Sequence, residues 1–160
     1  MKRRRLLLSL LWMALGVQFV SADTGKESIG QLKVSLFHGT DGKAASGGKS
    51  VTEAVSANLQ RTAALKFQNY SLIGEDVQDI LRSYEMWAKP SRTDEQFMVS
   101  YEPLGSKMKN SIRLDLELWW QKRKILKTDP LLKIGEPLYI RGPEWRKGRL
   151  IIAVELLKLK

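Results

Sequence analysis

A strict alternation of apolar side chains over residues 111–120 constrains the fold more than any other stretch of the chain. Ile112, Leu114, Leu116, Leu118 and Trp120 occupy every second position, and mostly polar residues stand between them. A helix would scatter these five side chains around its circumference, whereas a strand places them all on one face. The pattern therefore predicts a half-buried β-strand whose apolar face packs against a second apolar layer.

Shorter alternations of the same kind predict further strands along most of the remaining chain. Turn-forming residues separate them, notably at residues 74–76 and in a loop over residues 142–148 that contains Trp145. One helix is expected over residues 51–64, because Ser50 and Glu53 form a capping box and apolar residues then recur on one face. The strands are expected at residues 32–38, 65–73, 80–88, 97–101, 125–128, 138–140 and 150–156.

These elements predict a mainly β fold in which one domain covers residues 31–160. We expect an antiparallel β-sandwich of seven to eight strands, with the early α-helix covering an edge or an open end. The alternative is an α+β fold with a single sheet backed by the helix. Residues 23–30 are expected to form a flexible N-terminus before this domain.

The N-terminal segment has the form of a signal peptide. A short positive region, Lys2 to Arg5, precedes an apolar run from Leu6 to Val20, and small residues follow near Ala22. The apolar run is shorter than a membrane-spanning helix requires, so residues 1–22 are interpreted as a cleaved export signal. The mature protein is then expected in the periplasm or outside the cell, with no membrane-spanning segment.

Charge and cysteine content narrow the classes of partner. Residues 1–22 carry four of the 27 lysines and arginines and none of the 17 acidic residues, so cleavage lowers the net charge from +10 to +6. An exported cationic domain favours an anionic envelope component or an acidic partner protein, and export makes nucleic acid an unsuitable ligand. The chain contains no cysteine, which excludes disulfides and thiolate zinc sites. No cofactor is expected.

Two motifs suggest catalysis, but the residues around each of them do not fit a catalytic site. The glycine-rich residues 43–50 lie between a predicted strand and a predicted helix, but Lys43 stands where a phosphate-binding loop requires glycine. His38, the only histidine, has no nucleophile elbow near it. We interpret the first motif as a flexible loop and His38 as a structural residue.

Carboxylate groups offer two further candidates. Asp115 and Glu117 share the polar face of the strand over residues 111–120, and glycosidases use such pairs as acid and base. Their neighbour Arg113 favours surface ion pairs instead. Asp41, Asp76 and Asp79 lack the ladder of oxygen ligands at loop spacing that calcium requires.

Aromatic and basic residues at two predicted turns form the candidate binding residues. An exposed tryptophan flanked by cations can stack on a sugar ring or bind a partner protein. The alternative is that Trp145 closes the end of the sandwich and that Trp119 packs under the helix. The candidate residues are Trp119, the hairpin residues Lys122, Arg123 and Lys124, and the loop residues Trp145, Arg146 and Lys147.

The sequence therefore favours an exported, non-enzymatic β-rich domain of the bacterial envelope that binds a ligand or another protein. Two alternatives stay open. One is a small hydrolase of envelope polymer that uses Asp115 and Glu117, and the other is a structural subunit of an envelope assembly.

Overall fold

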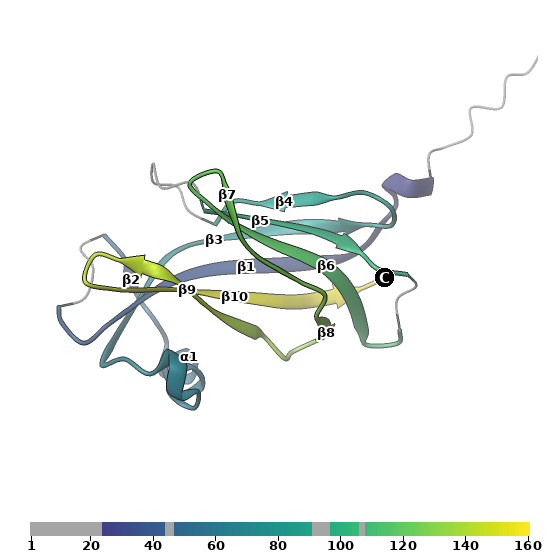
Figure 1. Ribbon diagram of the computed structural model, residues 1–160. Helices are drawn as coiled ribbons and strands as arrows, with labels where there is room; N and C mark the ends of the chain where they lie inside the picture. The colour runs from purple at the N-terminus through teal and green to yellow at the C-terminus, as the bar shows by residue number, and fades with distance from the viewer. Residues whose placement is uncertain (1–23, 44–46, 91–96, 106–107) are drawn as a thin grey trace, which may run out of the picture.

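A computed structural model describes residues 24–43, 47–90, 97–105 and 108–160. The predicted signal peptide, residues 1–22, lies outside these ranges, as do residues 44–46 of the glycine-rich segment. The described residues form a mainly β fold with one α-helix and two sheets of antiparallel strands, neither of which is closed (Figure 1). No helix in these ranges is long and apolar enough to cross a membrane.

The first sheet, sheet A, has the strand order β2-β3-β1-β10-β9. Its central strands are long because β1 pairs with β3 on one side and with β10 on the other along most of its length. Its members are β1 (Ser28–Thr40), β2 (Lys49–Ser50), β3 (Asn69–Leu81), β9 (Leu138–Trp145) and β10 (Gly148–Leu159).

The second sheet, sheet B, has the order β4-β5-β6-β7, and a short strand, β8, pairs with the start of β6. The predicted strand over residues 111–120 is confirmed as β6, the centre of this sheet. Ile112, Leu114, Leu116 and Leu118 are at most 1% exposed. The members of sheet B are β4 (Met86–Ala88), β5 (Phe97–Pro103), β6 (Ser111–Trp120), β7 (Arg123–Thr128) and β8 (Leu131–Lys133).

Two hydrophobic clusters lie on opposite faces of sheet A. The larger one combines Leu32, Val34 and Leu36 of β1 with the apolar face of β6, so it joins the two sheets. The smaller one forms around Phe37 and Leu59 and joins the other face of sheet A to the helix. Both faces of the second half of β1 are consequently buried, so residues 34–40 are buried without alternation, the polar Ser35, His38 and Thr40 included.

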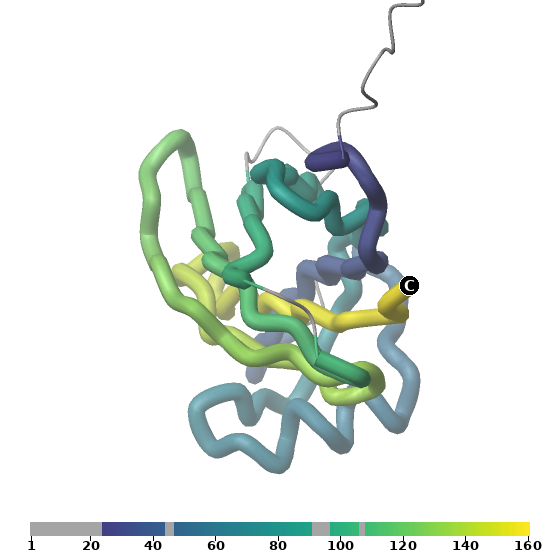
Figure 2. The backbone as a smooth tube through the Cα atoms, turned by 90° about the vertical axis from the view of Figure 1, so that its right-hand side faces the viewer, coloured from purple at the N-terminus to yellow at the C-terminus, as the bar shows by residue number. Residues whose placement is uncertain are grey.

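The helix α1 (Glu53–Gln60) packs on a sheet face, and the prediction that it covers an edge or an open end is wrong. Figures 1 and 2 show it at the bottom of the molecule, on the opposite side of sheet A from β4 and β5. It is shorter than the predicted residues 51–64 because Thr52, whose hydroxyl accepts a hydrogen bond from Val55 N, caps it, while Ser50 pairs in β2. Two short 3₁₀ turns complete the helical content, η1 (Thr24–Lys26) and η2 (Ala63–Leu65).

Pairing with neighbouring strands overrides several local turn signals. The predicted turn at residues 74–76 is wrong, because Gly74, Glu75 and Asp76 pair with Leu36, Ser35 and Val34 inside β3. The predicted strand over residues 80–88 is divided between the end of β3 and β4, with a turn between them. At the N-terminus, β1 begins at Ser28, inside the segment expected to be flexible.

The predicted loop over residues 142–148 is also wrong, because β9 continues to Trp145. Gly142 lies so close to β10 that a Cβ atom there would stand 2.9 Å from the Leu150 carbonyl oxygen and 2.8 Å from Ile152 Cδ1. This glycine permits close strand contact and does not mark a turn. Only Arg146 and Lys147 form the turn between β9 and β10.

Candidate functional site

The turn between β9 and β10 is tight and strained. Trp145 pairs with Gly148, and the two residues between them, Arg146 and Lys147, have φ angles of 45° and 58°. Positive φ at both central positions is typical of a type I′ hairpin, where asparagine and glycine are the favoured residues. The hairpin therefore carries two cationic side chains at positions where the backbone disfavours them.

Contacts with β1 hold this hairpin in place. His38 Nε2 lies 3.0 Å from the Trp145 carbonyl oxygen, and the two rings meet edge to face with centroids 5.0 Å apart. The Thr40 hydroxyl donates a hydrogen bond of 3.1 Å to the Lys147 carbonyl oxygen. A Cβ atom on Gly148 would overlap the Gly39 carbonyl oxygen and the His38 ring, so only glycine allows this approach.

His38 serves this anchoring role in its neutral form. A carbonyl oxygen only accepts hydrogen bonds, so Nε2 carries the proton that it donates to Trp145. Burial lowers the pKa of His38, and the charge of Arg146 lowers it further, against the opposing effect of the hydrogen bond to Trp145. Its Nδ1 atom is buried and has no hydrogen-bond partner in the described ranges. These features agree with a structural histidine.

Beside the hairpin lies an open pocket of about 490 Å³, which we call the basic cup. Arg149 is fixed on one side by hydrogen bonds of 3.1 Å to the Gly142 carbonyl oxygen and 2.7 Å to Glu144. The Arg146 guanidinium stands 4.3 Å from the centre of the Trp145 ring. The cup is lined by Phe67, Arg141, Glu144, Trp145, Arg146, Lys147, Gly148 and Arg149.

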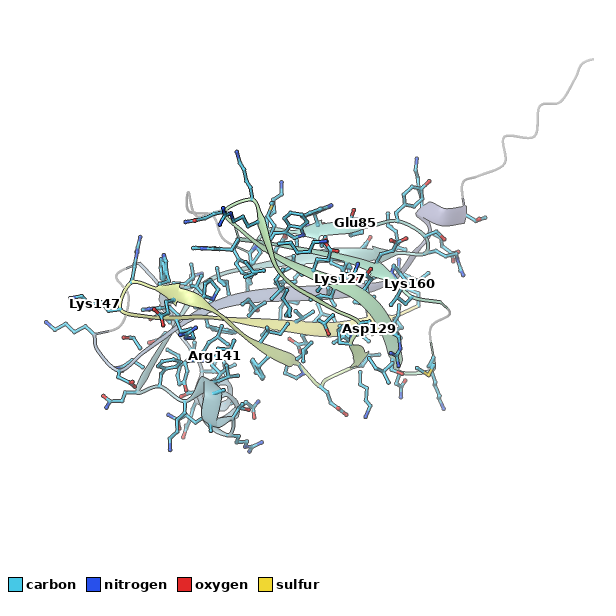
Figure 3. The ribbon with its side chains drawn as sticks, in the orientation of Figure 1. Glu85, Lys127, Asp129, Arg141, Lys147 and Lys160 are labelled. Carbon is cyan, nitrogen blue, oxygen red and sulfur yellow. The ribbon has the colours of Figure 1, made fainter. Side chains whose placement is uncertain are left out.

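Two exposed cations of the cup are available to a ligand. Arg141 and Lys147 form no ion pair with any described residue. Figure 3 shows Lys147 at the outer end of the hairpin, pointing away from the sheets, and Arg141 at the same end of the molecule. Four cationic side chains thus face one carboxylate, Glu144, which Arg149 already binds. The cup is suited to an anion.

The turn between β6 and β7 forms a second cationic tip. Gln121 and Lys122 have φ angles of 48° and 64°, so this turn repeats the strained geometry of the first. Lys122 and Arg123 are exposed and form no ion pair among the described residues. Lys124 is different, because it binds Glu117 at 2.9 Å and stands 5.4 Å from the centre of the Trp119 ring.

The predicted binding residues therefore form two groups. Trp145, Arg146 and Lys147 lie together on sheet A, whereas Trp119 and Lys124 lie together on the outer face of sheet B. Both turns lie at the left-hand end of the sheets in Figure 1. Trp119 does not pack under the helix, since its ring contacts are Trp87, at 5.8 Å between centroids, and Lys124.

Asp115 and Glu117 lie on the outer face of sheet B, where Lys127 bridges them. Lys127 Nζ is 2.7 Å from Asp115 and 3.1 Å from Glu117. Hydrogen bonds from Lys124 and Lys127 lower the pKa of Glu117, which keeps this carboxylate ionised. A glycosidase needs the opposite for its acid, a raised pKa.

Other candidate ligand groups are engaged separately. Asp41 accepts a hydrogen bond from Gln68 N, and Asp79 accepts one from the Gln31 amide. Asp76 binds Lys89 N at 2.8 Å. Within the described residues, no group of three or more histidine, cysteine, aspartate or glutamate side chains is placed to hold a metal ion.

Three residues of these surfaces were not among the candidate binding residues: Arg141, Arg149 and Trp87. Arg141 and Arg149 are eight positions apart in the chain, and only the pairing of β9 with β10 brings them to the same hairpin as Trp145. Comparison with protein-family models, curated proteins and solved structures found no match.

Proposed function

We propose that this chain is an exported, non-enzymatic β-sandwich domain that binds an anionic component of the bacterial envelope. The observation that carries the proposal is the basic cup, in which Arg149 and Arg146 are held in place while Arg141 and Lys147 remain unpaired among the described residues. Guanidinium groups held before the ligand arrives lose little conformational entropy on binding. The sandwich arrangement is supported by the hydrophobic cluster that both sheets share.

Export to the periplasm or the cell exterior rests on the signal-like residues 1–22, which bring the domain to envelope polymers and lipid surfaces. The second cationic tip, with Lys122 and Arg123, lies at the same end of the sheets and adds two exposed cations there. A binding role is favoured over a hydrolase because Lys127 bridges the two candidate catalytic carboxylates.

The test compares two double variants of the mature protein that remove the same charge. Arg141→Gln/Lys147→Gln removes the unpaired cations of the cup. Lys26→Gln/Lys160→Gln removes one cation of η1, which Figure 1 draws in purple at the opposite end of the sheets, and one at the C-terminus, which Figure 3 labels at that end. Binding is measured to vesicles of phosphatidylcholine with and without phosphatidylglycerol, to soluble polyphosphate and to polyglutamate. These probes separate a lipid surface, a soluble anionic polymer and an acidic polypeptide.

We expect the cup variant to bind the anionic probe about thirty-fold more weakly, because each cation near an anionic surface contributes about 1 kcal/mol. The control variant should bind like the wild type, and salt should weaken all binding. Equal binding by both variants, or binding to polyglutamate alone, would contradict the proposal of an envelope surface; the latter result would assign the cup to an acidic partner protein.

A further inference from the structure

The outer face of sheet B carries a second surface, which is distinct from the basic cup. Trp87 of β4 lies opposite Ser100 of β5, and Ser100 lies opposite Glu117 of β6, which in turn pairs with Lys127 of β7. Neighbouring strands are about 4.8 Å apart, so this row spans about 14 Å. A second row, two residues along the strands, contains Met98, Trp119 and Lys124.

Two indole rings form the apolar part of this surface. Trp87 and Trp119 lie 5.8 Å apart between centroids, and Trp87 is 36% exposed. Met98, which is partly exposed, pairs with Trp119. We call these three residues the tryptophan platform. Platforms of this kind bind ligands that present a flat, weakly polar face.

A fixed network of charged groups borders the platform. Lys124 binds Glu117 at 2.9 Å, and Lys127 binds both Glu117 and Asp115. Donors and acceptors therefore alternate beside the rings, and their mutual hydrogen bonds hold them in position. A ligand rich in hydroxyl groups can form hydrogen bonds with this network, and little side-chain entropy is lost because the charged groups are already ordered.

A small hollow lies at Ser100, beside this network. The hollow measures about 40 Å³, enough for one small polar group, and Glu85, Glu102, Asp115 and Glu117 surround it. Among the described residues, Lys124 and Lys127 pair with two of these four carboxylates, Asp115 and Glu117. The lining of the hollow is therefore acidic, the opposite of the basic cup, and disfavours anionic ligands.

We infer that the outer face of sheet B is a binding site for a neutral glycan, with pyranose rings stacked on Trp87 and Trp119. A pyranose ring has a face of C–H groups that suits an indole and a rim of hydroxyls that suits alternating carboxylates and ammonium groups. A neutral sugar avoids the repulsion that the four carboxylates impose on an anionic one. The row from Trp87 to Lys127 has the length of a short oligosaccharide.

The test titrates the mature protein with cellohexaose and with chitohexaose and follows the indole N–H signals by NMR. We expect the signals of Trp87 and Trp119 to shift, while that of Trp145 stays in place. Trp87→Ala should weaken binding about ten-fold, because it removes one stacking ring. Trp145→Ala, the matched control in the basic cup, should bind these sugars like the wild type.

Two further variants separate stacking from folding and from the basic cup. Trp87→Tyr keeps an aromatic ring and should bind within about three-fold of the wild type. In the Arg141→Gln/Lys147→Gln background, an oligogalacturonate should bind at least about ten-fold more weakly than cellohexaose. If the proposed binding of an anion by the basic cup is refuted, these expected outcomes stay the same, because the two sites share no residue.

The inference is overturned if neither hexasaccharide shifts the Trp87 and Trp119 signals, or if Trp87→Ala and Trp145→Ala weaken binding equally. It is also overturned if hexalysine binds this face more tightly than either sugar, with loss of binding at high salt. That result would assign the face to a cationic polypeptide.

Discussion

Replacing Gly148 with alanine should detach the β9–β10 hairpin from β1. A Cβ atom at this position would overlap the Gly39 carbonyl oxygen and the His38 ring. Both obstacles are fixed, one as backbone in the centre of sheet A and the other as a side chain that is 1% exposed. The hairpin must therefore move, because β1 cannot.

The structure gives the size of the effect. The movement breaks the hydrogen bond from His38 to Trp145, the hydrogen bond from Thr40 to Lys147, and the edge-to-face ring contact. Each of these contributes about 1 kcal/mol, so the free energy of unfolding should fall by about 3 kcal/mol. Alanine also lowers the conformational entropy of the unfolded chain, which offsets part of this decrease in the free energy of unfolding.

Gly42→Ala is the matched control. Among the described residues, a Cβ atom there would lie near only the Thr40 hydroxyl, at 3.6 Å, so none of them has to move. Urea denaturation of both variants, followed by circular dichroism, measures the difference, in which the unfolded-state contribution of alanine cancels. A Gly148→Ala protein within about 0.5 kcal/mol of the Gly42→Ala protein would refute the reasoning.

Three further predictions concern pH, turn strain and packing. The folded protein holds the pKa of His38 below 6.5, so the unfolded chain binds a proton first as the pH falls, and the free energy of unfolding should decrease between pH 7 and 5. His38→Gln should make this decrease smaller, as measured by urea denaturation at several pH values. An equal decrease in the variant would exclude His38 as its source. Gln121→Asn/Lys122→Gly should relieve the positive-φ strain of the β6–β7 turn and raise the melting temperature in calorimetry by about 2–4 °C; a decrease would show that the turn is not strained. Leu118→Ala, in the core between the sheets, should lower the free energy of unfolding by about 3 kcal/mol in urea denaturation. Ile125→Ala, at a side chain that is 43% exposed, should change it by less than about 0.5 kcal/mol. Similar losses in the two variants would contradict the assigned faces of sheet B.

The candidate residues illustrate how far local sequence can predict a site. Trp145, Arg146 and Lys147 are neighbours in the chain, so their grouping follows from the sequence alone, and the structure adds Arg141 and Arg149 through strand pairing. Trp87 and Trp119 are separated by 31 intervening residues, and only the pairing of β4, β5 and β6 brings their rings together. No local pattern encodes that contact.

The sequence by itself determined the β-rich character of the chain and the buried face of β6, because side chains alternate across a strand at every residue. It could not determine that Gly74 and Asp76 lie inside β3, or that Gly142 lies inside β9. Glycine and acidic residues are typical of turns, but hydrogen bonds to β1 and close contact with β10 stabilise extended backbone at these positions. Only the tertiary structure decided this, since it brings distant strands to the same sheet and so decides which local preference prevails.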